Sequence, residues 1–410
     1  MPNLPSRTAS IVLIGLSLVA ATVRAQPPGR MVGPWDLGEL KQVPSSSWGE
    51  DKDRVREVYY EGAKLDGKPT RVFGYYARPE TGDGPFPAML LVHGGGGKAF
   101  SGWARLWADR GYVALAMDLA GHGPDGKRLP DGGPGQDDPT KFRDFDPARP
   151  ESMWTYHAVA AIVRGHSLLA AREEVDAGRV GVTGISWGGY LTCIVAGVDD
   201  RLKVAVPVYG CGFLHEDSVW KASQFDRMTP DRRDRWVGTF DPSKYLPRVR
   251  CPILFVNGTN DFAYPLDSYR RSYEAVPGFE DLANPDRLCV TLRMPHGHEQ
   301  GWKPKEIGIF VDGVLKQGEP LAKLAGPAMQ GGRISAKFAS KAPIEKAELL
   351  YAIDAGPWPM REWKAVPATI EGEIVGAPLP PGRPLVAFLN VVDRRGAVVS
   401  SPYLVVPKAD

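Results

Sequence analysis

The chain has 410 residues, of which 43% are hydrophobic, and a formal net charge of +2, with 50 lysines and arginines against 48 acidic residues. This length and composition suffice for a large core and predict one large domain with a smaller one beside it. Because the charges balance and no basic run occurs, a surface for phosphate backbones is excluded, and we expect no nucleic-acid partner.

The N-terminus has the pattern of a secretory signal peptide. Arg7 precedes the apolar stretch 11–23, and small residues lead up to a cut after Ala25. The stretch is shorter than a membrane span, so we expect cleavage, no membrane span in the mature chain, and a secreted or periplasmic location. An uncleaved anchor is the alternative. We assign residues 1–25 to the signal peptide and 26–54 to an N-terminal extension.

The segments that follow predict an α/β fold with a mostly parallel sheet flanked by helices. The ranges 55–60 and 70–78 alternate between apolar and polar residues and indicate an antiparallel edge pair. Short apolar runs then follow, and runs that are apolar on both faces are typical of strands buried under helices on each side. The expected buried strands are 88–92, 113–119, 180–185, 204–209, 253–256 and 288–294, and the expected helices are 101–110, 152–174, 187–198, 266–275 and 304–315.

Two segments interrupt this alternation. The range 122–150 is rich in proline, glycine and aspartate, and we expect a surface excursion; its aspartates follow no calcium-loop spacing, so no metal is expected. The range 212–246 is rich in aromatic residues. We expect a cap insertion there, whose aromatic side chains either face a substrate or pack as the cap's own small core.

The C-terminal part of the chain has a different pattern. From about residue 326 short alternating strands separated by Pro/Gly turns predict a small all-β sandwich domain at 326–410, after a catalytic domain at 55–325. The cysteines form no CxxC pair and lie in or beside apolar segments, so we expect buried free thiols rather than a zinc site. They are Cys193, Cys211, Cys251 and Cys289.

A serine stands between glycines directly after an expected strand, in Gly184-Ile185-Ser186-Trp187-Gly188. A nucleophile on a strained turn between a strand and a helix needs neighbours without bulk, so that its hydroxyl is exposed. Alone, the motif is equally consistent with a structural turn. A second glycine run, 94–97 after His93, follows the strand 88–92. It exposes backbone N–H groups, and one of them together with the N–H of Trp187 would stabilise the oxyanion formed by attack on a carbonyl.

A serine nucleophile also needs a histidine to accept its proton and a carboxylate to orient that histidine. Asp261 follows the strand 253–256, although an aspartate in an Asn-Gly turn can also simply cap the turn. His296 and His298 follow the strand 288–294, and both lie at the edge of the sheet where ligands bind in open α/β sheets. Either could reach the serine. We favour His298 as the base, because Gly297 frees the loop before it, and we expect His296 to bind substrate or support the base.

Together these residues resemble the α/β-hydrolase superfamily. Within it, the chain is most similar to exported acetyl xylan esterases, dienelactone hydrolases and the hydrolase domains of prolyl oligopeptidases, over residues 55–315. The resemblance implies ester hydrolysis through an acyl-enzyme without a cofactor. Its catalytic residues would be Ser186, His298 and Asp261, with backbone donors at Gly94, Gly95 and Trp187. Dienelactone hydrolases typically use a cysteine nucleophile, whereas this chain has a serine.

We therefore expect a secreted serine carboxylic ester hydrolase, similar to the acetyl xylan esterases, that deacetylates carbohydrate. Candidate substrate-binding residues are His93, Trp220, His296 and Trp302. One alternative is a peptidase or amidase like the prolyl oligopeptidases, although fewer than about 60 residues precede the sheet, too few for a propeller. The other is a non-catalytic module that keeps the fold for binding, which an intact triad argues against.

Overall fold

The computed structural model describes residues 31–284 and 286–407. The signal peptide expected at residues 1–25 lies outside these ranges. Within them, no helix is long and apolar enough to cross a membrane.

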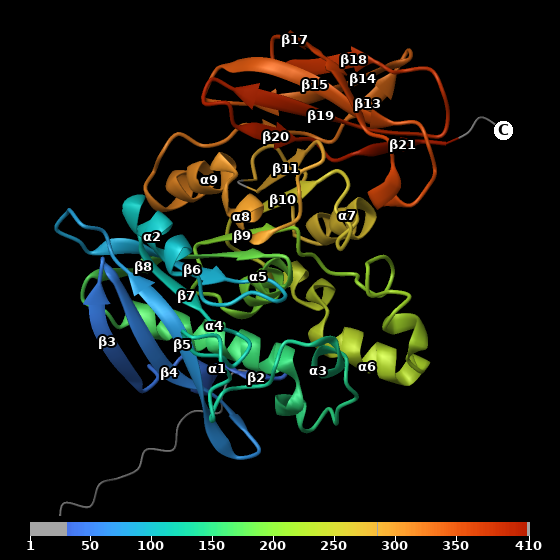
Figure 1. Ribbon diagram of the computed structural model, residues 1–410. Helices are drawn as coiled ribbons and strands as arrows, with labels where there is room; N and C mark the ends of the chain where they lie inside the picture. The colour runs from blue at the N-terminus through green and yellow to red at the C-terminus, as the bar shows by residue number, and fades with distance from the viewer. Residues whose placement is uncertain (1–30, 285, 408–410) are drawn as a thin grey trace, which may run out of the picture.

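A nine-stranded sheet forms the centre of the molecule (Figure 1). Its strands from β6 to β11 are parallel to one another, whereas β3, β4 and β5 form an antiparallel edge that joins β7 through β5. The mostly parallel sheet expected from the apolar runs is therefore confirmed. In spatial order the strands are β11 (Arg287–Thr291), β10 (Leu254–Gly258), β9 (Val204–Val208), β8 (Val175–Ile185), β6 (Phe86–Val92), β7 (Val113–Met117), β5 (Lys68–Ala77), β4 (Val55–Leu65) and β3 (Ser46–Lys52).

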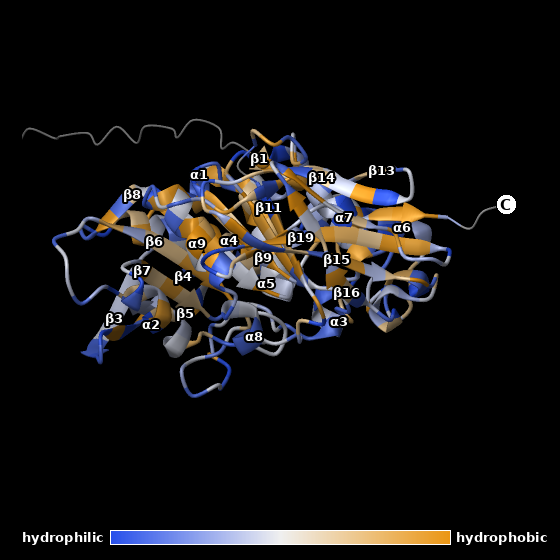
Figure 2. Cartoon of the chain, turned by 90° about the horizontal axis from the view of Figure 1, so that it is seen from above, coloured by the Kyte–Doolittle hydropathy of each residue, from blue (hydrophilic) through white to orange (hydrophobic). Residues whose placement is uncertain are grey.

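Helices cover both faces of this sheet. Helices α4 (Trp154–Ala170) and α5 (Trp187–Val198) pack against each other and against β6 and β8. On the other side lie α2 (Ser101–Asp109), against β5 and β7, and α9 (Lys305–Leu315), against β8 and β9 (Figure 1). Because both faces are covered, strands β7 and β9 are buried along their whole length. Figure 2 shows the same arrangement as apolar strands at the centre of the molecule.

The N-terminal extension belongs to this domain. Its elements are β1 (Met31–Val32), β2 (Trp35–Asp36) and α1 (Leu37–Leu40), and β3 adds a third edge strand where only two were expected. The Trp35 side chain is fully buried, and its Nε1 donates a hydrogen bond to the carbonyl of Tyr156 on α4 at 3.0 Å. The extension is thus fixed to the helical layer by a buried aromatic anchor.

The segment 122–150 is only partly the surface excursion that we expected. It contains the short helix α3 (Asp138–Lys141), and the side chains of Phe142 and Phe145 after it are buried. The ring of Phe142 packs on those of Trp187 and Trp236, with centroids 5.8 and 5.4 Å apart. The expectation that this segment supplies no core was wrong, because its apolar partners come from distant parts of the chain.

The cap segment folds around α6 (Pro230–Phe240) and three short 3-10 turns, Phe225–Arg227, Pro242–Lys244 and Leu246–Arg248. Thr229 caps α6 by accepting a hydrogen bond from the N–H of Arg232. Its aromatic residues Phe225, Trp236 and Phe240 are almost completely buried. Of the two alternatives for these three side chains, packing as the cap's own core is the one observed.

Two facing antiparallel sheets form the small C-terminal β domain, as expected. One contains β12 (Lys323–Leu324), β14 (Arg333–Ala339), β18 (Ile374–Pro378) and β17 (Thr369–Glu371), with β13 (Ala328–Gln330) on β14. The other contains β16 (Lys364–Pro367), β15 (Ile344–Ala352), β19 (Leu385–Asp393) and β20 (Val398–Ser400), with β21 (Leu404–Val406) on β19.

The C-terminal domain covers the β11 edge of the large sheet. The hydroxyl of Ser400 accepts a hydrogen bond from the N–H of Val290 at 2.8 Å, and the side-chain amide of Asn390 donates to the Val290 carbonyl at 3.1 Å. These bonds satisfy backbone groups that an edge strand would otherwise leave unpaired. All four cysteines are free thiols, and all but Cys251 are buried.

Candidate active site

Ser186 lies on a strained turn between β8 and α5, near the centre of the large sheet. Its backbone has φ 59° and ψ −117°, a region that side chains rarely adopt. The flanking glycines are required sterically: a Cβ on Gly184 would lie 2.2 Å from the Gly188 carbonyl oxygen, and one on Gly188 would lie 2.0 Å from that of Val92. The sequence motif thus forms the expected turn, which presents the serine at the carboxyl end of β8.

Asp261 follows β10 and is held by its own loop. Its Oδ1 accepts hydrogen bonds from the N–H groups of Ala263 and Tyr264, at 2.9 and 2.8 Å. Its Oδ2 accepts a hydrogen bond from Nδ1 of His296 at 2.6 Å. Asp261 is only 3% exposed, so its carboxylate is screened from water. The side chain is therefore more than a turn cap, because its second oxygen is used by a histidine.

This hydrogen bond contradicts the expected pairing of Asp261 with His298. Because the carboxylate binds Nδ1 of His296, it fixes the tautomer that leaves Nε2 as a proton acceptor. No described residue makes a hydrogen bond to that Nε2. The ring is held in place by stacking on Tyr209, with centroids 4.3 Å apart, and by Phe262 at 4.9 Å. The histidine that has the geometry of a base is His296.

His298 lies on the other side of the site, at the start of the short helix α8 (His298–Trp302). Its Nε2 accepts a hydrogen bond from the N–H of Gly94 at 3.0 Å. Burial, and then the positive charges that His93 and His296 can carry, lower its pKa to about 4. At neutral pH the ring is therefore uncharged, and its acceptor nitrogen is used by a backbone group. The two histidines are separated by Gly297 alone, yet they make different contacts.

Of the three predicted backbone donors, two make no hydrogen bond to another described residue. The N–H of Trp187 begins α5 and is among the first donors of a helix, which have no intrahelical partner. The N–H of Gly95 has no acceptor in the described part of the chain, whereas that of Gly94 is used by His298. A Cβ on Gly95 would lie 2.9 Å from the Trp187 ring, so the glycine loop lies against this side chain.

His93 does not face the site as a substrate-binding group, contrary to our expectation. It is 1% exposed, and both of its ring nitrogens bind backbone: Nδ1 donates to the Gly94 carbonyl at 2.8 Å, and Nε2 accepts from the Leu119 N–H at 2.8 Å. Since no ring nitrogen is left for a ligand, His93 serves to hold the glycine loop against the end of β7.

The two tryptophan candidates lie in different surroundings. Trp220 is 9% exposed, and its ring packs on those of Trp187 and Tyr264, with centroids 4.5 and 5.3 Å apart. Trp302 ends α8 and is half-buried against Phe100, at 5.4 Å. Trp302 is therefore the more accessible of the two.

Two residues near Ser186 were missed in the sequence. The hydroxyl of Tyr264 is fully buried beside the Ser186 side chain, without the geometry of a hydrogen bond to it or to another described residue. Burial raises the pKa of this phenol far above its usual range, and the serine hydroxyl acts in the opposite direction. Its place three residues after Asp261 was the only signal in the sequence.

The second missed residue is Lys141, in the segment expected at the surface. It is 4% exposed, and its ammonium lies 4.2 Å from the centroid of the Trp187 ring and 2.9 Å from Asp138. Burial lowers its pKa, and the hydrogen bond and charge of Asp138 oppose that shift. A cation thus stabilises the aromatic ring behind the serine turn.

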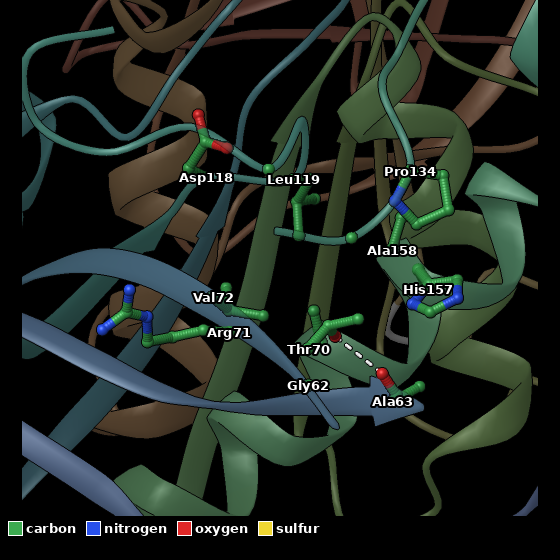
Figure 3. Close-up of a pocket in the computed structure, with 13 residues that line it drawn as sticks. Gly62, Ala63, Thr70, Arg71, Val72, Asp118, Leu119, Pro134, His157 and Ala158 are labelled. Atoms are coloured by element: carbon green, nitrogen blue, oxygen red, sulfur yellow. Dashed lines mark hydrogen bonds between the residues drawn. The ribbon is translucent and has the colours of Figure 1, made fainter. Parts of the chain in front are cut away.

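Figure 3 shows a different depression, of about 310 Å³, between β4, β5 and α4. Thr70, Asp118 and His157 are among its lining residues, and none of the predicted site residues lines it. The Thr70 hydroxyl donates to the Ala63 carbonyl at 2.6 Å, and Asp118 accepts from the N–H groups of Ala120 and His122. These side chains stabilise turns, so we place the site at Ser186.

The sheet has antiparallel strands only at one edge, a serine turn follows a central strand, and an Asp–His pair follows later strands. These features characterise the α/β-hydrolase fold, and the chain has this fold. Within the superfamily, residues 41–222 match the model of the acetyl xylan esterase (AXE1) family. This match includes the glycine loop and Ser186. It ends before Asp261 and His296, whose pairing rests on the geometry.

Individual proteins support this placement. The chain is 24% identical over 257 residues to the acetyl esterase Axe7A of Xylanibacter ruminicola, an alignment that covers 56% of this chain and 55% of Axe7A. It is 27% identical over 247 residues to YtaP of Bacillus subtilis, covering 55% of this chain and 77% of that protein.

Two solved structures share the fold. The acetyl xylan esterase from Paenibacillus sp. R4 superposes with a TM-score of 0.50 at 23% identity, over 64% of this chain and 86% of that one. Acetyl xylan esterase 1 from Thermoanaerobacterium sp. JW/SL YS485 superposes with a TM-score of 0.51 at 18% identity, over 70% of this chain and 96% of that one.

Proposed function

We propose that this protein is a serine carboxylic ester hydrolase that works through an acyl-enzyme and removes acetyl groups from carbohydrate. The observation that carries the proposal is the 2.6 Å hydrogen bond between Asp261 and His296, at the same sheet edge as the strained Ser186 turn. The match of residues 41–222 to the acetyl xylan esterase family supports the ester and the acetyl group.

In the proposed first half-reaction, Nε2 of His296 accepts the Ser186 proton while the serine oxygen attacks the ester carbonyl carbon. Asp261 stabilises the charged imidazolium, and the N–H groups of Trp187 and Gly95 donate to the oxyanion. The tetrahedral species collapses when His296 returns the proton to the leaving alcohol oxygen. Water then attacks the acyl-enzyme by the same steps in reverse, which releases acetate and restores the serine.

The test is hydrolysis by the purified full chain of p-nitrophenyl acetate, acetylated xylan and a prolyl p-nitroanilide, with Ser186→Ala measured in parallel. We expect release of p-nitrophenol and acetate by the wild type and a loss of at least about 10⁴-fold in the variant. A fluorophosphonate should label Ser186, identified by peptide mass. Full turnover in Ser186→Ala would refute the assignment, and preference for the amide would favour a peptidase instead. Uniform inactivity would favour a binding module.

We also propose that the protein is exported and that residues 1–25 are removed. The support is the basic, apolar and small-residue pattern of this stretch. N-terminal sequencing of the protein recovered from a bacterial periplasm or medium should begin at Gln26. Recovery of the protein with residues 1–25 intact would contradict this.

A further inference from the structure

One segment of the C-terminal domain reaches the loop that carries Asp261. It is the range 353–363, which connects β15 to β16 and which we call the β15–β16 loop. Asn260 directly precedes Asp261, and its side-chain amide donates two hydrogen bonds to this loop, to the Pro359 carbonyl at 3.0 Å and to the Arg361 carbonyl at 2.9 Å. The residue beside the orienting carboxylate is therefore bonded to the other domain.

A second residue joins the loop of His296 to the same segment. Arg293 lies between β11 and His296, and its Nη2 donates a hydrogen bond to the Trp363 carbonyl at 3.2 Å. Its backbone has φ 52°, in the left-handed region that residues with a side chain rarely adopt. The contact with Trp363 therefore supports an unfavourable turn on the path from β11 to the histidine.

The two loops are also bonded to each other. The Thr259 hydroxyl donates to the side-chain oxygen of Asn260 at 2.9 Å and accepts from the N–H of Arg293 at 3.0 Å. The N–H of Thr259 donates to the Thr291 carbonyl at 3.0 Å. Asn260 and Arg293 thus belong to one hydrogen-bonded network, from which three carbonyls of the C-terminal domain accept.

The β15–β16 loop is held by the core of its own domain. Trp363 is 1% exposed, and its ring packs on that of Phe388 in β19, with centroids 5.4 Å apart. The Arg361 guanidinium lies over the Trp358 ring, 3.6 Å from its centroid, and its Nε donates to the Gly356 carbonyl at 2.9 Å. The carbonyls of this loop are therefore a fixed support for the network, because the side chains beside them are packed.

We propose that the C-terminal domain sets the relative position of Asp261 and His296, and that Asn260 and Arg293 are the positioning residues through which it acts. This inference rests on the proposed function, which makes His296 the base of Ser186 and Asp261 its orienting carboxylate. Such a pair must be held within about 0.5 Å of its productive geometry by side chains outside the pair. The domain is thus a working part of the active site.

The experiment is steady-state hydrolysis of p-nitrophenyl acetate by Asn260→Ala, Arg293→Ala and Arg293→Lys in the full chain. We expect kcat to fall about 10- to 100-fold in the two alanine variants, the cost of a misplaced catalytic group, while KM stays close to the wild-type value. Arg293→Lys keeps a donor for the Trp363 carbonyl and should retain most of kcat. Because φ 52° is unfavourable for arginine, alanine and lysine alike, these substitutions test the side chain.

The matched control is Asn390→Ala, which removes a side-chain amide that joins the same two domains at Val290 of β11 but contacts neither loop. It should leave kcat unchanged. An unchanged kcat in both Asn260→Ala and Arg293→Ala, or an equal fall in Asn390→Ala, would overturn the proposal while ester hydrolysis itself stands. If Asn260→Ala does not fold, Arg293→Ala and Arg293→Lys decide, and an equal loss in these two overturns the proposal.

A second measurement does not depend on activity. The N–H groups of Ala263 and Tyr264 donate to Oδ1 of Asp261, so their hydrogen exchange reports whether the carboxylate is in place. Measured by mass spectrometry, exchange at these amides should be about tenfold faster in Asn260→Ala than in the wild type or Asn390→Ala. Equal rates in all three would overturn the proposal. If the wild type hydrolyses no ester, the proposed function fails, and the exchange still decides whether the C-terminal domain holds the loop of Asp261.

Discussion

Nδ1 of His296 donates a hydrogen bond to Oδ2 of Asp261 at 2.6 Å, whereas His298, two residues later, binds the N–H of Gly94 at 3.0 Å. Two histidines of one loop thus face opposite sides of the serine turn. One is paired with the buried carboxylate, and the other with the glycine loop. In the proposed mechanism, the base and the residue that holds the glycine loop are therefore two different histidines.

The two histidines should differ sharply when each is replaced. His296→Ala removes the proton acceptor that Asp261 orients, so we expect kcat to fall by at least about 10⁴-fold. His298→Ala removes one neutral hydrogen bond and should cost about tenfold or less. Steady-state hydrolysis of p-nitrophenyl acetate by both variants measures this directly. Equal losses would contradict the division of roles, and a larger loss for His298→Ala would reverse it.

The choice between these histidines could not be made from the sequence. Both follow β11, and both are within one residue of Gly297, so their order and spacing carry no preference. Which histidine pairs with the carboxylate depends on where the loop places the second carboxylate oxygen of Asp261. It also depends on the N–H of Gly94, which lies 204 positions before His298 in the chain. The sheet and Ser186 were more predictable, because each depends on a local pattern of apolar residues or glycines.

The burial of residues 142–145 was unpredictable for a related reason. The local composition of the segment 122–150 indicates a loop, and its few aromatic residues have no partners nearby in the chain. Phe142 is buried because Trp187 follows the serine and Trp236 lies in the cap. Long-range packing of this kind overrides local propensity.

The turn at residue 186 should be more stable with glycine than with alanine. Ser186 has φ 59° and ψ −117°, a conformation that glycine adopts without strain. We expect Ser186→Gly to unfold with a free energy about 1 kcal/mol larger than Ser186→Ala, after the greater unfolded-state entropy of glycine is taken into account. Urea denaturation of the two inactive variants measures the difference. Equal stability of the two would show that the turn relaxes without cost.

The Tyr264 hydroxyl should contribute to the rate without contributing to stability. It is fully buried beside Ser186 and has no hydrogen-bond partner among the described residues. We expect it to donate to the serine oxygen or to the bound ester, so Tyr264→Phe should lower kcat about tenfold, the size of one hydrogen bond. The melting temperature of the Tyr264→Phe protein should not fall, because the substitution removes an unpaired buried hydroxyl.

Tyr273 offers a matched control for this prediction. Its hydroxyl is also buried without a partner in the described part of the chain, but its ring packs on Phe255 and Phe279, beneath β10. Tyr273→Phe should therefore leave kcat unchanged. If Tyr264→Phe and Tyr273→Phe have the same activity as the wild type, the Tyr264 hydroxyl has no part in the reaction.

His157 should make the protein less stable as the pH falls below neutral. It is 6% exposed, and burial lowers its pKa from 6.5 to about 4. Between these two values the unfolded chain binds a proton that the folded chain does not, so protonation favours unfolding. Above about pH 6.5 this contribution vanishes. From pH 7 to pH 5 we expect it to reduce the free energy of unfolding by about 2 kcal/mol.

A variant comparison isolates this contribution, because other buried groups titrate in the same range. Burial raises the pKa of Asp286 to about 6, and protonation of that carboxyl in the folded chain acts in the opposite direction. We therefore compare the wild type with His157→Gln, whose amide can still donate to the Glu151 carbonyl that His157 Nε2 contacts at 2.7 Å. Guanidinium denaturation at pH 7 and pH 5 should show a smaller loss of stability in the variant, by about 2 kcal/mol. The same loss in both proteins would mean that His157 is protonated in the folded chain at pH 5.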